Sequence, residues 1–269
     1  MTIEQIIVLA IVQGITEFLP VSSSGHLILV PTLSGWKDQG LITDVMVHMG
    51  SFVAVLVYFW RDVVKLTKGG IDLLRLKFTL NARMALWIII GTIPAVIFGL
   101  YVKKTGLIDQ VRGAEIVAWN AIIFGILMYI ADRFGPKQKH MEDIGWRTAL
   151  AIGVAQAIAI IPGTSRSGIT MTAGRALSMT RPEAARFSFL LGIPAIAGAG
   201  VLVLSEAVAA GETISGDAVL AAVLTFFSAL AAIAFLMALV KRVSFLPFVI
   251  YRLALGFLLL WLIQNGTIA

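Results

Sequence analysis

Six long apolar stretches constrain this chain more than any other feature. They cover residues 45–60, 84–101, 116–131, 187–204, 218–240 and 248–263. Each is close to the ~20 residues that cross a bilayer as a helix. Because 59% of the residues are hydrophobic and only 13% are charged, the chain cannot form an ordinary water-facing surface. We therefore expect an all-α, polytopic membrane protein with six transmembrane helices in one domain, residues 1–269.

Basic residues gather in the connections between these stretches, over residues 61–83, 133–147, 175–186 and 241–242. By the positive-inside rule these connections face the cytoplasm. The connection over residues 205–217 has three acidic residues and no lysine or arginine, so it should face outward. The net charge of +6 thus reflects topology, and we expect no nucleic-acid partner.

Two further apolar segments, residues 3–19 and 148–161, each run into a proline and a serine-glycine-rich break. Proline and glycine leave backbone polar groups unpaired, which a membrane tolerates only inside protein or beside a wet cavity. Two re-entrant helical hairpins satisfy this condition. We expect the first to enter from outside and the second from the cytoplasm, so that their tips meet in mid-membrane.

An internal repeat supports this arrangement. Residues 22–25 match residues 165–168 in the pattern Ser-x-Ser-Gly, and the same offset aligns Gln13 with Gln156. Three crossings in each half would invert the second half relative to the first, giving an inverted repeat with halves of approximately 1–133 and 144–269. The alternative is chance similarity between two glycine-serine turns.

The first break carries residues suited to chemistry. Gln13 and Glu17 are four residues apart and share a helix face. A carboxylate within a membrane is costly, so Glu17 should be functional, as metal ligand, general base or partner of a serine or arginine. His26 lies close after Ser22 and Ser23 and could exchange a proton, be phosphorylated or simply bond a backbone carbonyl.

The second break has the composition of a phosphate cradle. Ser165, Arg166 and Ser167 combine hydroxyl groups, a guanidinium and small residues at a helix start, where backbone N–H groups are exposed. Thr170 lies one turn further and would extend the polar face. The alternative for Arg166 is snorkelling to the interface or pairing with an acid.

Three polar residues lie at the ends of the apolar stretches. Asp44 and His48 begin the first span, where they could support the site or line its entrance, or be a helix cap and an interfacial histidine. Arg252 lies near the start of the last span. We expect its side chain to snorkel to the cytoplasmic interface.

The two breaks together resemble the undecaprenyl-diphosphate phosphatase family linked to bacitracin resistance. The two family motifs, (E/Q)-x-x-x-E and P-G-x-S-R-S-x-x-T, are both complete here, at residues 13–17 and 162–170. Similarity also runs through residues 187–191 and 242–248, so that it covers nearly the whole chain. The family pattern accepts Gln13 at its first position, although glutamine is a weaker cation ligand than glutamate.

This resemblance implies hydrolysis of undecaprenyl diphosphate to undecaprenyl phosphate and inorganic phosphate. That reaction recycles the lipid carrier for peptidoglycan and other envelope polymers, and it confers bacitracin resistance. The resemblance also implies a multi-pass protein of the bacterial inner cell membrane, surrounded by lipids, with its active site open to the outer side. The oligomeric state stays open, with a homodimer as one candidate.

Our mechanistic hypothesis combines both breaks. Arg166 binds the diphosphate with help from a set of polar side chains, namely Gln13, Ser22, Ser165, Ser167 and Thr170. A divalent cation, Mg²⁺ or Ca²⁺, bridges the phosphate oxygens and Glu17. The attacking group is Ser23, His26 or a water molecule activated by His26. The competing functions are a polyprenyl-phosphate transporter or flippase that uses the same midplane site, and a membrane scaffold.

Overall fold

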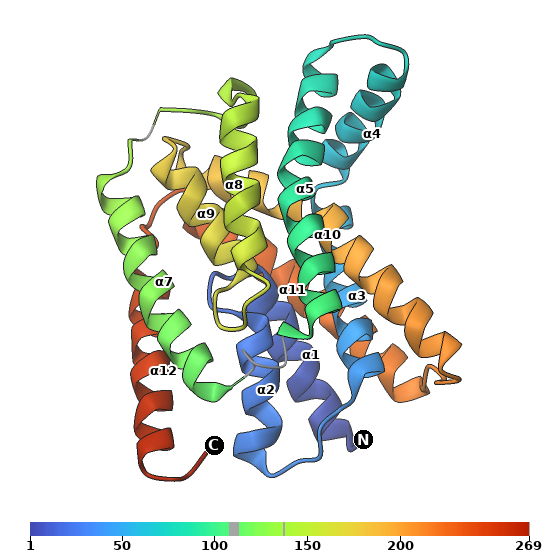
Figure 1. The fold of residues 1–269 in the computed structure, drawn as a ribbon, viewed down its shortest axis with the longest axis vertical. Coiled ribbons are helices and arrows are strands. Elements are labelled where there is room, and N and C mark those ends of the chain that lie inside the picture. The colour runs from blue at the N-terminus through green and yellow to red at the C-terminus, as the bar shows by residue number, and fades with distance from the viewer. Residues whose placement is uncertain (108–112, 137, 269) are drawn as a thin grey trace.

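The computed structural model describes residues 1–107, 113–136 and 138–268. The last residue of the second proposed half lies outside this part. The described chain is 79% helical and contains no strand. Its helices, in chain order, are α1 (Ile3–Phe18), α2 (Ser23–Ser34), α3 (Leu41–Tyr58), α4 (Trp60–Leu74), α5 (Leu80–Thr105), α7 (Ala114–Phe134), η1 (Met141–Asp143), α8 (Trp146–Ile158), α9 (Arg166–Ala176), α10 (Arg181–Ala209), α11 (Gly216–Leu239) and α12 (Leu246–Gln264) (Figure 1).

Six of the described helices are long and apolar enough to cross a membrane: α3, α5, α7, α10, α11 and α12. The prediction of an all-α protein with six transmembrane helices is thereby confirmed. The basic connection after the first span is itself helical, because the chain interrupts α3 at Phe59 and begins α4 at once. Figure 1 shows α4 and the start of α5 as a hairpin that projects at one end of the molecule.

The two segments outside the six spans each form a helix, a break and a second helix. In the first pair α1 packs on α2, and in the second α8 packs on α9. A serine precedes the second helix in both: Ser22 has a φ of 77° and Ser165 a φ of 70°. A positive φ is uncommon outside glycine, so the two breaks share an unusual backbone conformation. They also touch, because the Ser167 hydroxyl donates to the carbonyl of Leu19 at 3.1 Å.

The two pairs pack on the six spans in a reciprocal way. Helix α1 of the first half lies against α11 of the second half, and α8 of the second half lies against α5 of the first. Glycine permits both close approaches. A Cβ atom on Gly14 would lie 2.7 Å from the backbone nitrogen of Ala229, and one on Gly153 would lie 2.7 Å from the Cα of Gly91.

Arg252 departs from its prediction. Its side chain does not snorkel to an interface, because it is fully buried on α12. The guanidinium donates to five backbone carbonyl oxygens, at distances of 3.0 to 3.3 Å, from Pro20, Asn120, Ala121, Gly163 and Thr164. The breaks leave carbonyl groups without helical partners, and a guanidinium carries five donors. The prediction was therefore wrong because Arg252 satisfies carbonyls of both hairpin breaks and of α7.

A second buried arginine fixes the far end of α9. Arg175 is fully buried, and its Nε donates to Asp132 of α7 at 3.1 Å. The same carboxylate accepts from Arg181 at 2.6 Å and from the backbone N–H of Phe245 at 3.0 Å. Helix α9 is therefore held at both ends, with Arg175 in its last turn and Arg166 in its first.

Candidate active site

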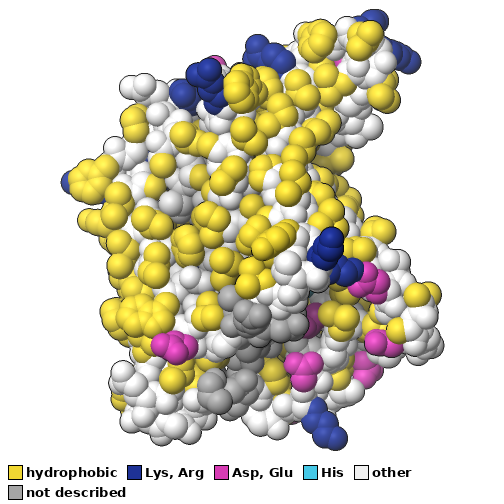
Figure 2. Space-filling model, in the orientation of Figure 1, with side chains coloured by type: hydrophobic (Ala, Val, Ile, Leu, Met, Phe, Trp, Pro, Cys, Tyr) yellow, Lys and Arg dark blue, Asp and Glu magenta, His cyan; other side chains and the backbone are white. Residues whose placement is uncertain are grey.

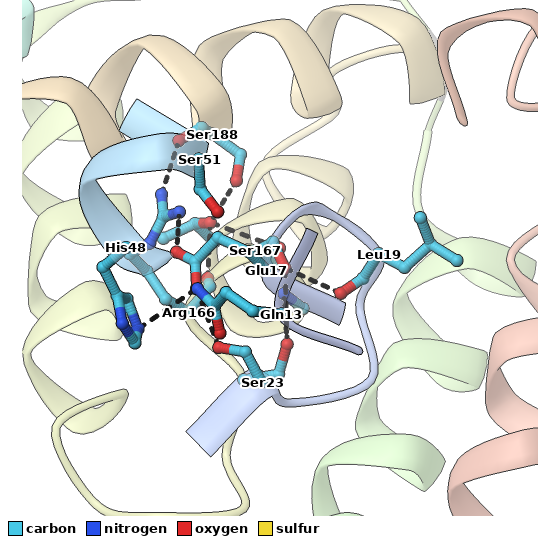
Figure 3. Close-up of polar contacts among 12 residues, drawn as sticks. Gln13, Glu17, Leu19, Ser23, His48, Ser51, Arg166, Ser167 and Ser188 are labelled. Atoms are coloured by element: carbon cyan, nitrogen blue, oxygen red, sulfur yellow. Dashed lines mark hydrogen bonds and ion pairs between the residues drawn. The ribbon is translucent and has the colours of Figure 1, made fainter. Parts of the chain in front are cut away.

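Glu17 is the centre of the polar cluster where the two breaks meet (Figure 3). It lies in the last turn of α1 and is only 7% exposed. Its Oε1 accepts from Arg166 Nη2 at 2.9 Å, and its Oε2 accepts from Ser23 Oγ at 2.7 Å and from Gln13 Nε2 at 3.1 Å. Both carboxylate oxygens are thus engaged, and a serine and an arginine from opposite halves of the chain share one acid.

Ser23 is the first residue of α2. The left-handed backbone of Ser22 turns the chain sharply between the proline of the break and the new helix. This turn brings the Ser23 hydroxyl back to Glu17, six residues earlier in the chain. A serine hydroxyl that donates to a buried carboxylate has its proton acceptor already in place, which is the arrangement of a nucleophile beside a general base.

Arg166 is the first residue of α9 and enters the cluster from the second break. Beyond Glu17, its guanidinium donates to the backbone carbonyl of Ser188 on α10 at 3.4 Å. Gly192, one turn further along α10, leaves the room it needs, because a Cβ there would lie 2.7 Å from Arg166 Cζ. Sequence reasoning did not assign roles to these α10 residues: Ser188 lies within the similarity over residues 187–191, and Gly192 lies just after it.

The histidine beside Glu17 is His48. Its Nε2 lies 3.6 Å from Glu17 Oε2, and its Nδ1 is 2.7 Å from the backbone carbonyl of Asp44 one turn earlier. A carbonyl only accepts, so Nδ1 carries a proton and Nε2 faces the carboxylate. Asp44 thus holds the His48 ring through its backbone carbonyl, and His48 lies beside Glu17.

His26 points elsewhere. Its Nδ1 lies 2.7 Å from the backbone carbonyl of Ser22, and its Nε2 lies 2.6 Å from the hydroxyl of Tyr251 on α12. The two rings stack with their centroids 5.8 Å apart. Both ring nitrogens of His26 are therefore engaged away from Glu17, in the backbone-bonded arrangement that was the alternative to a catalytic role.

The remaining predicted residues support the cluster from behind. Ser165 caps α9, its Oγ accepting from the backbone N–H of Gly168 at 3.1 Å. Thr170 shares a hydrogen bond of 2.6 Å with the Ser188 hydroxyl. Gln13 and Ser167 are fully enclosed, and the Oε1 of Gln13 has no hydrogen-bond partner among the described residues.

A cavity of about 360 Å³ opens beside the cluster. Its lining combines polar side chains with apolar ones, and most of the apolar ones come from α3 and α10. The polar lining comes from both breaks and α3: Thr16, Glu17, Ser22, Ser23, Ser24, Asp44, His48, Ser165 and Arg166. The apolar lining is Leu41, Val45, Ala159, Ala195, Ile196, Ala199, Gly200 and Val203. Gln13, His26, Ser167 and Thr170 do not line it.

Comparison with known proteins assigns the chain to a family. A family model described as bacitracin resistance protein BacA matches residues 6–258. The chain belongs to the BacA family. The match includes both breaks and reaches every one of the six spans, so the resemblance seen in the motifs of the BacA family extends over nearly the whole chain.

Similar proteins carry one common name. An undecaprenyl-diphosphatase of Erythrobacter litoralis is 49% identical over 282 residues, covering 97% of this chain and 99% of that protein. An undecaprenyl-diphosphatase of a Ruegeria species is 47% identical, with the same coverage. One from Alteromonas mediterranea is 45% identical and covers 98% of this chain and 99% of its own length. Each of these relatives therefore matches nearly the whole chain rather than one segment of it.

Proposed function

We propose that this chain hydrolyses undecaprenyl diphosphate to undecaprenyl phosphate and inorganic phosphate. The observation that carries the proposal is the cluster of Glu17, Ser23 and Arg166 in the lining of a cavity within a six-span membrane protein. The same cavity is also lined by apolar side chains of α3 and α10, which suits a lipid whose head is charged. The names of the relatives support the same substrate.

Ser23 is the nucleophile in this proposal. Its Oγ forms a bond to the terminal phosphorus, the bridging P–O bond breaks, and undecaprenyl phosphate leaves with the bridging oxygen. Glu17 takes the hydroxyl proton across the 2.7 Å hydrogen bond. Water then attacks the phosphoserine, and Glu17 returns a proton to the serine oxygen, releasing inorganic phosphate.

Arg166 stabilises the phosphoryl group in both steps. A guanidinium matches phosphate oxygens with paired donors, and the N-terminus of α9 adds the positive end of a helix dipole. In the structure Arg166 pairs with Glu17 Oε1. The proposal requires the guanidinium to bond the substrate phosphate from the cavity side, which it lines.

A divalent cation fits this site only with help from the substrate. Among the described residues no group of three His, Cys, Asp or Glu side chains could hold a metal ion. Glu17 would supply an oxygen ligand from the cavity lining, and the diphosphate would supply the others. When bound, Mg²⁺ or Ca²⁺ would neutralise charge on the phosphate oxygens.

We further propose that the two helix pairs are re-entrant hairpins related by an inverted repeat, with the cavity open to the outer side. The matching positive-φ serines and the reciprocal packing of α1 on α11 and of α8 on α5 support the repeat. The cavity is lined by the second half of α10, and the chain continues from α10 into the acidic connection that is expected outside.

The test is phosphate release by the purified protein in detergent, with a polyprenyl diphosphate as substrate. Ser23→Ala, Glu17→Gln and Arg166→Lys should each lower the rate by about 100-fold or more, because each removes a group used in the transition state. Ser24→Ala is the matched control, since Ser24 lines the same cavity but has no contact with Glu17 among those described. Full activity in Ser23→Ala would overturn the assignment of the nucleophile.

Trapping with labelled substrate distinguishes the attacking groups. A phosphoenzyme that survives acid and is lost in alkali indicates phosphoserine, whereas an acid-labile one indicates phosphohistidine. His26→Gln should retain most of the hydrolysis, because its ring faces Tyr251 rather than the cluster. Lipid movement without phosphate release would favour the flippase function over hydrolysis.

A further inference from the structure

The hairpin formed by α4 and the start of α5 carries the most exposed large apolar side chains in the described part of the chain. Leu74 is 86% exposed, Leu76 82% and Phe78 77%, at the tip of the hairpin. Leu74 is the last residue of α4, Leu76 and Phe78 follow it, and all three lie outside the six spans. Such exposure on neighbouring residues marks an interaction surface rather than scattered surface apolars.

The apolar surface continues along α4. Trp60, Val64, Ile71 and Leu74 recur at helical spacing on one face, and all are exposed. The opposite side of α4 is held against α5, where Gly69 lies against the backbone of Asn81. An amphipathic helix of 15 residues, with one side on its own protein and an apolar stripe left uncovered, has the form of an interfacial helix.

Basic residues border this stripe and alternate with the apolar tip. Residues 60–83 include six basic side chains and two acidic ones: Arg61, Lys65, Lys68, Arg75, Lys77 and Arg83 against Asp62 and Asp72. The acids are already engaged, since Asp62 pairs with Arg186 on α10 and Asp72 accepts from Thr79. The hairpin therefore presents a positive charge together with apolar side chains (Figure 2).

The hairpin is also built to hold these side chains in place. The tip turn is closed by backbone bonds from Leu76 to Leu73 at 3.0 Å and from Lys77 to Asp72 at 2.8 Å. The ion pair between Asp62 and Arg186 fixes the base of α4 to the bundle. A rigid, basic and apolar surface at the end of a membrane domain is complementary to the anionic surface of the leaflet beside it.

We propose that α4 and the hairpin tip, residues 60–80, dock on the anionic lipid surface of the cytoplasmic leaflet. The apolar side chains Leu74, Leu76 and Phe78 enter the boundary between headgroups and acyl chains. Arg75 and Lys77 between them contact lipid phosphates. This surface is separate from the catalytic cavity and does not depend on the function proposed above.

The absence of cysteine from the chain allows a direct test by spin labelling. A nitroxide at Leu76→Cys is compared with one at Thr213→Cys, an exposed residue of the α10–α11 connection, in full-length protein reconstituted in vesicles. In phosphatidylglycerol vesicles, the Leu76 label should collide readily with oxygen and severalfold less with an aqueous nickel chelate. The Thr213 label should show the opposite. Phe78→Cys is a second labelling site.

Lipid charge and the basic residues complete the test. Replacing phosphatidylglycerol by phosphatidylcholine should lower the ratio of membrane-immersed label to water-exposed label. Introducing Arg75→Gln and Lys77→Gln should also lower this ratio, by about fivefold for each basic residue removed. Nickel access equal to that at Thr213 in all vesicles would overturn the proposal. Equal immersion of the label in phosphatidylglycerol and phosphatidylcholine vesicles would overturn the proposed preference for anionic lipid. Spin–spin broadening that disappears on dilution with unlabelled protein would identify a second copy as the partner instead.

Discussion

At the scale of single residues, Gly192 determines whether Arg166 can reach Glu17. The guanidinium occupies the volume that a side chain at position 192 would take. The ion pair with Glu17, at 2.9 Å, therefore depends on the absence of one methyl group on α10. The cluster therefore could not be predicted from its two breaks alone, because α10 leaves the space that the Arg166 guanidinium occupies.

We predict that Gly192→Ala lowers kcat for phosphate release by about 100-fold, the cost of misplacing a catalytic group by roughly an ångström. The substituted Cβ would lie 2.7 Å from Arg166 Cζ, so the guanidinium must move. Gly198→Ala, also on α10, is the control, because a Cβ there meets no atom within 4 Å. Equal rates for the two variants would contradict this view of Arg166.

At the scale of elements, Arg252 joins the two hairpin breaks to α7 and α12. Its five acceptors come from three separate segments of the chain. A buried carbonyl left unpaired costs about 1–3 kcal/mol. Lysine carries three donors on a single nitrogen and cannot span the same acceptors.

Arg252→Lys should therefore reduce the free energy of unfolding by several kcal/mol, on the order of two or three unpaired carbonyls. The measurement is the melting temperature of the purified protein in detergent, beside Arg133→Lys on the exposed side of α7. The control should melt like the native chain. If both variants melt alike, Arg252 does not hold the breaks together.

At the scale of the whole molecule, charge sorts between two ends with an apolar belt between them. In Figure 2 many basic side chains gather at the end that carries the turn between α4 and α5 and the start of α8, while most acidic side chains in view, with some basic ones, lie towards the other end. The exposed aliphatic and aromatic side chains of the six spans fill the middle. By the positive-inside rule, we expect the basic end to face the cytoplasm.

The orientation can be tested by single cysteines in a cysteine-free chain. We expect Thr213→Cys to react with a membrane-impermeant maleimide in intact cells or spheroplasts. Lys68→Cys should react only after the membrane is permeabilised. The opposite pattern would place the cavity on the cytoplasmic side.

Local signals explain what could be predicted from the sequence. Apolar length indicated the six spans, and the proline, glycine and serine breaks indicated the two helix pairs that surround the site. Glu17, Ser23 and Arg166 could be predicted because charged or reactive side chains are unusual within apolar sequence. Chain proximity then favoured His26 as the histidine beside Ser23.

Contacts between residues that are distant in the chain explain what could not be predicted from the sequence. Tyr251, 225 positions away, engages His26, while His48 lies against Glu17 from another helix. The burial of Arg252 was missed because a charge near a span end usually snorkels, and its acceptors lie 88 to 232 residues away in the chain. The basic connection also gave no sign that α4 would be a separate helix with an uncovered stripe.

The bonds of Arg252 have a mechanical consequence. Since one guanidinium bonds carbonyls of both breaks, we expect the two breaks to move together. The part of the cavity lining that the breaks form should then be stiff. Motions of the surrounding helices should therefore change the distance between Glu17 and Arg166 only slightly. We expect α3 and α10, which line the cavity, to move apart when a long lipid binds. The lipid tail would then enter from the side while Glu17, Ser23 and Arg166 keep their positions.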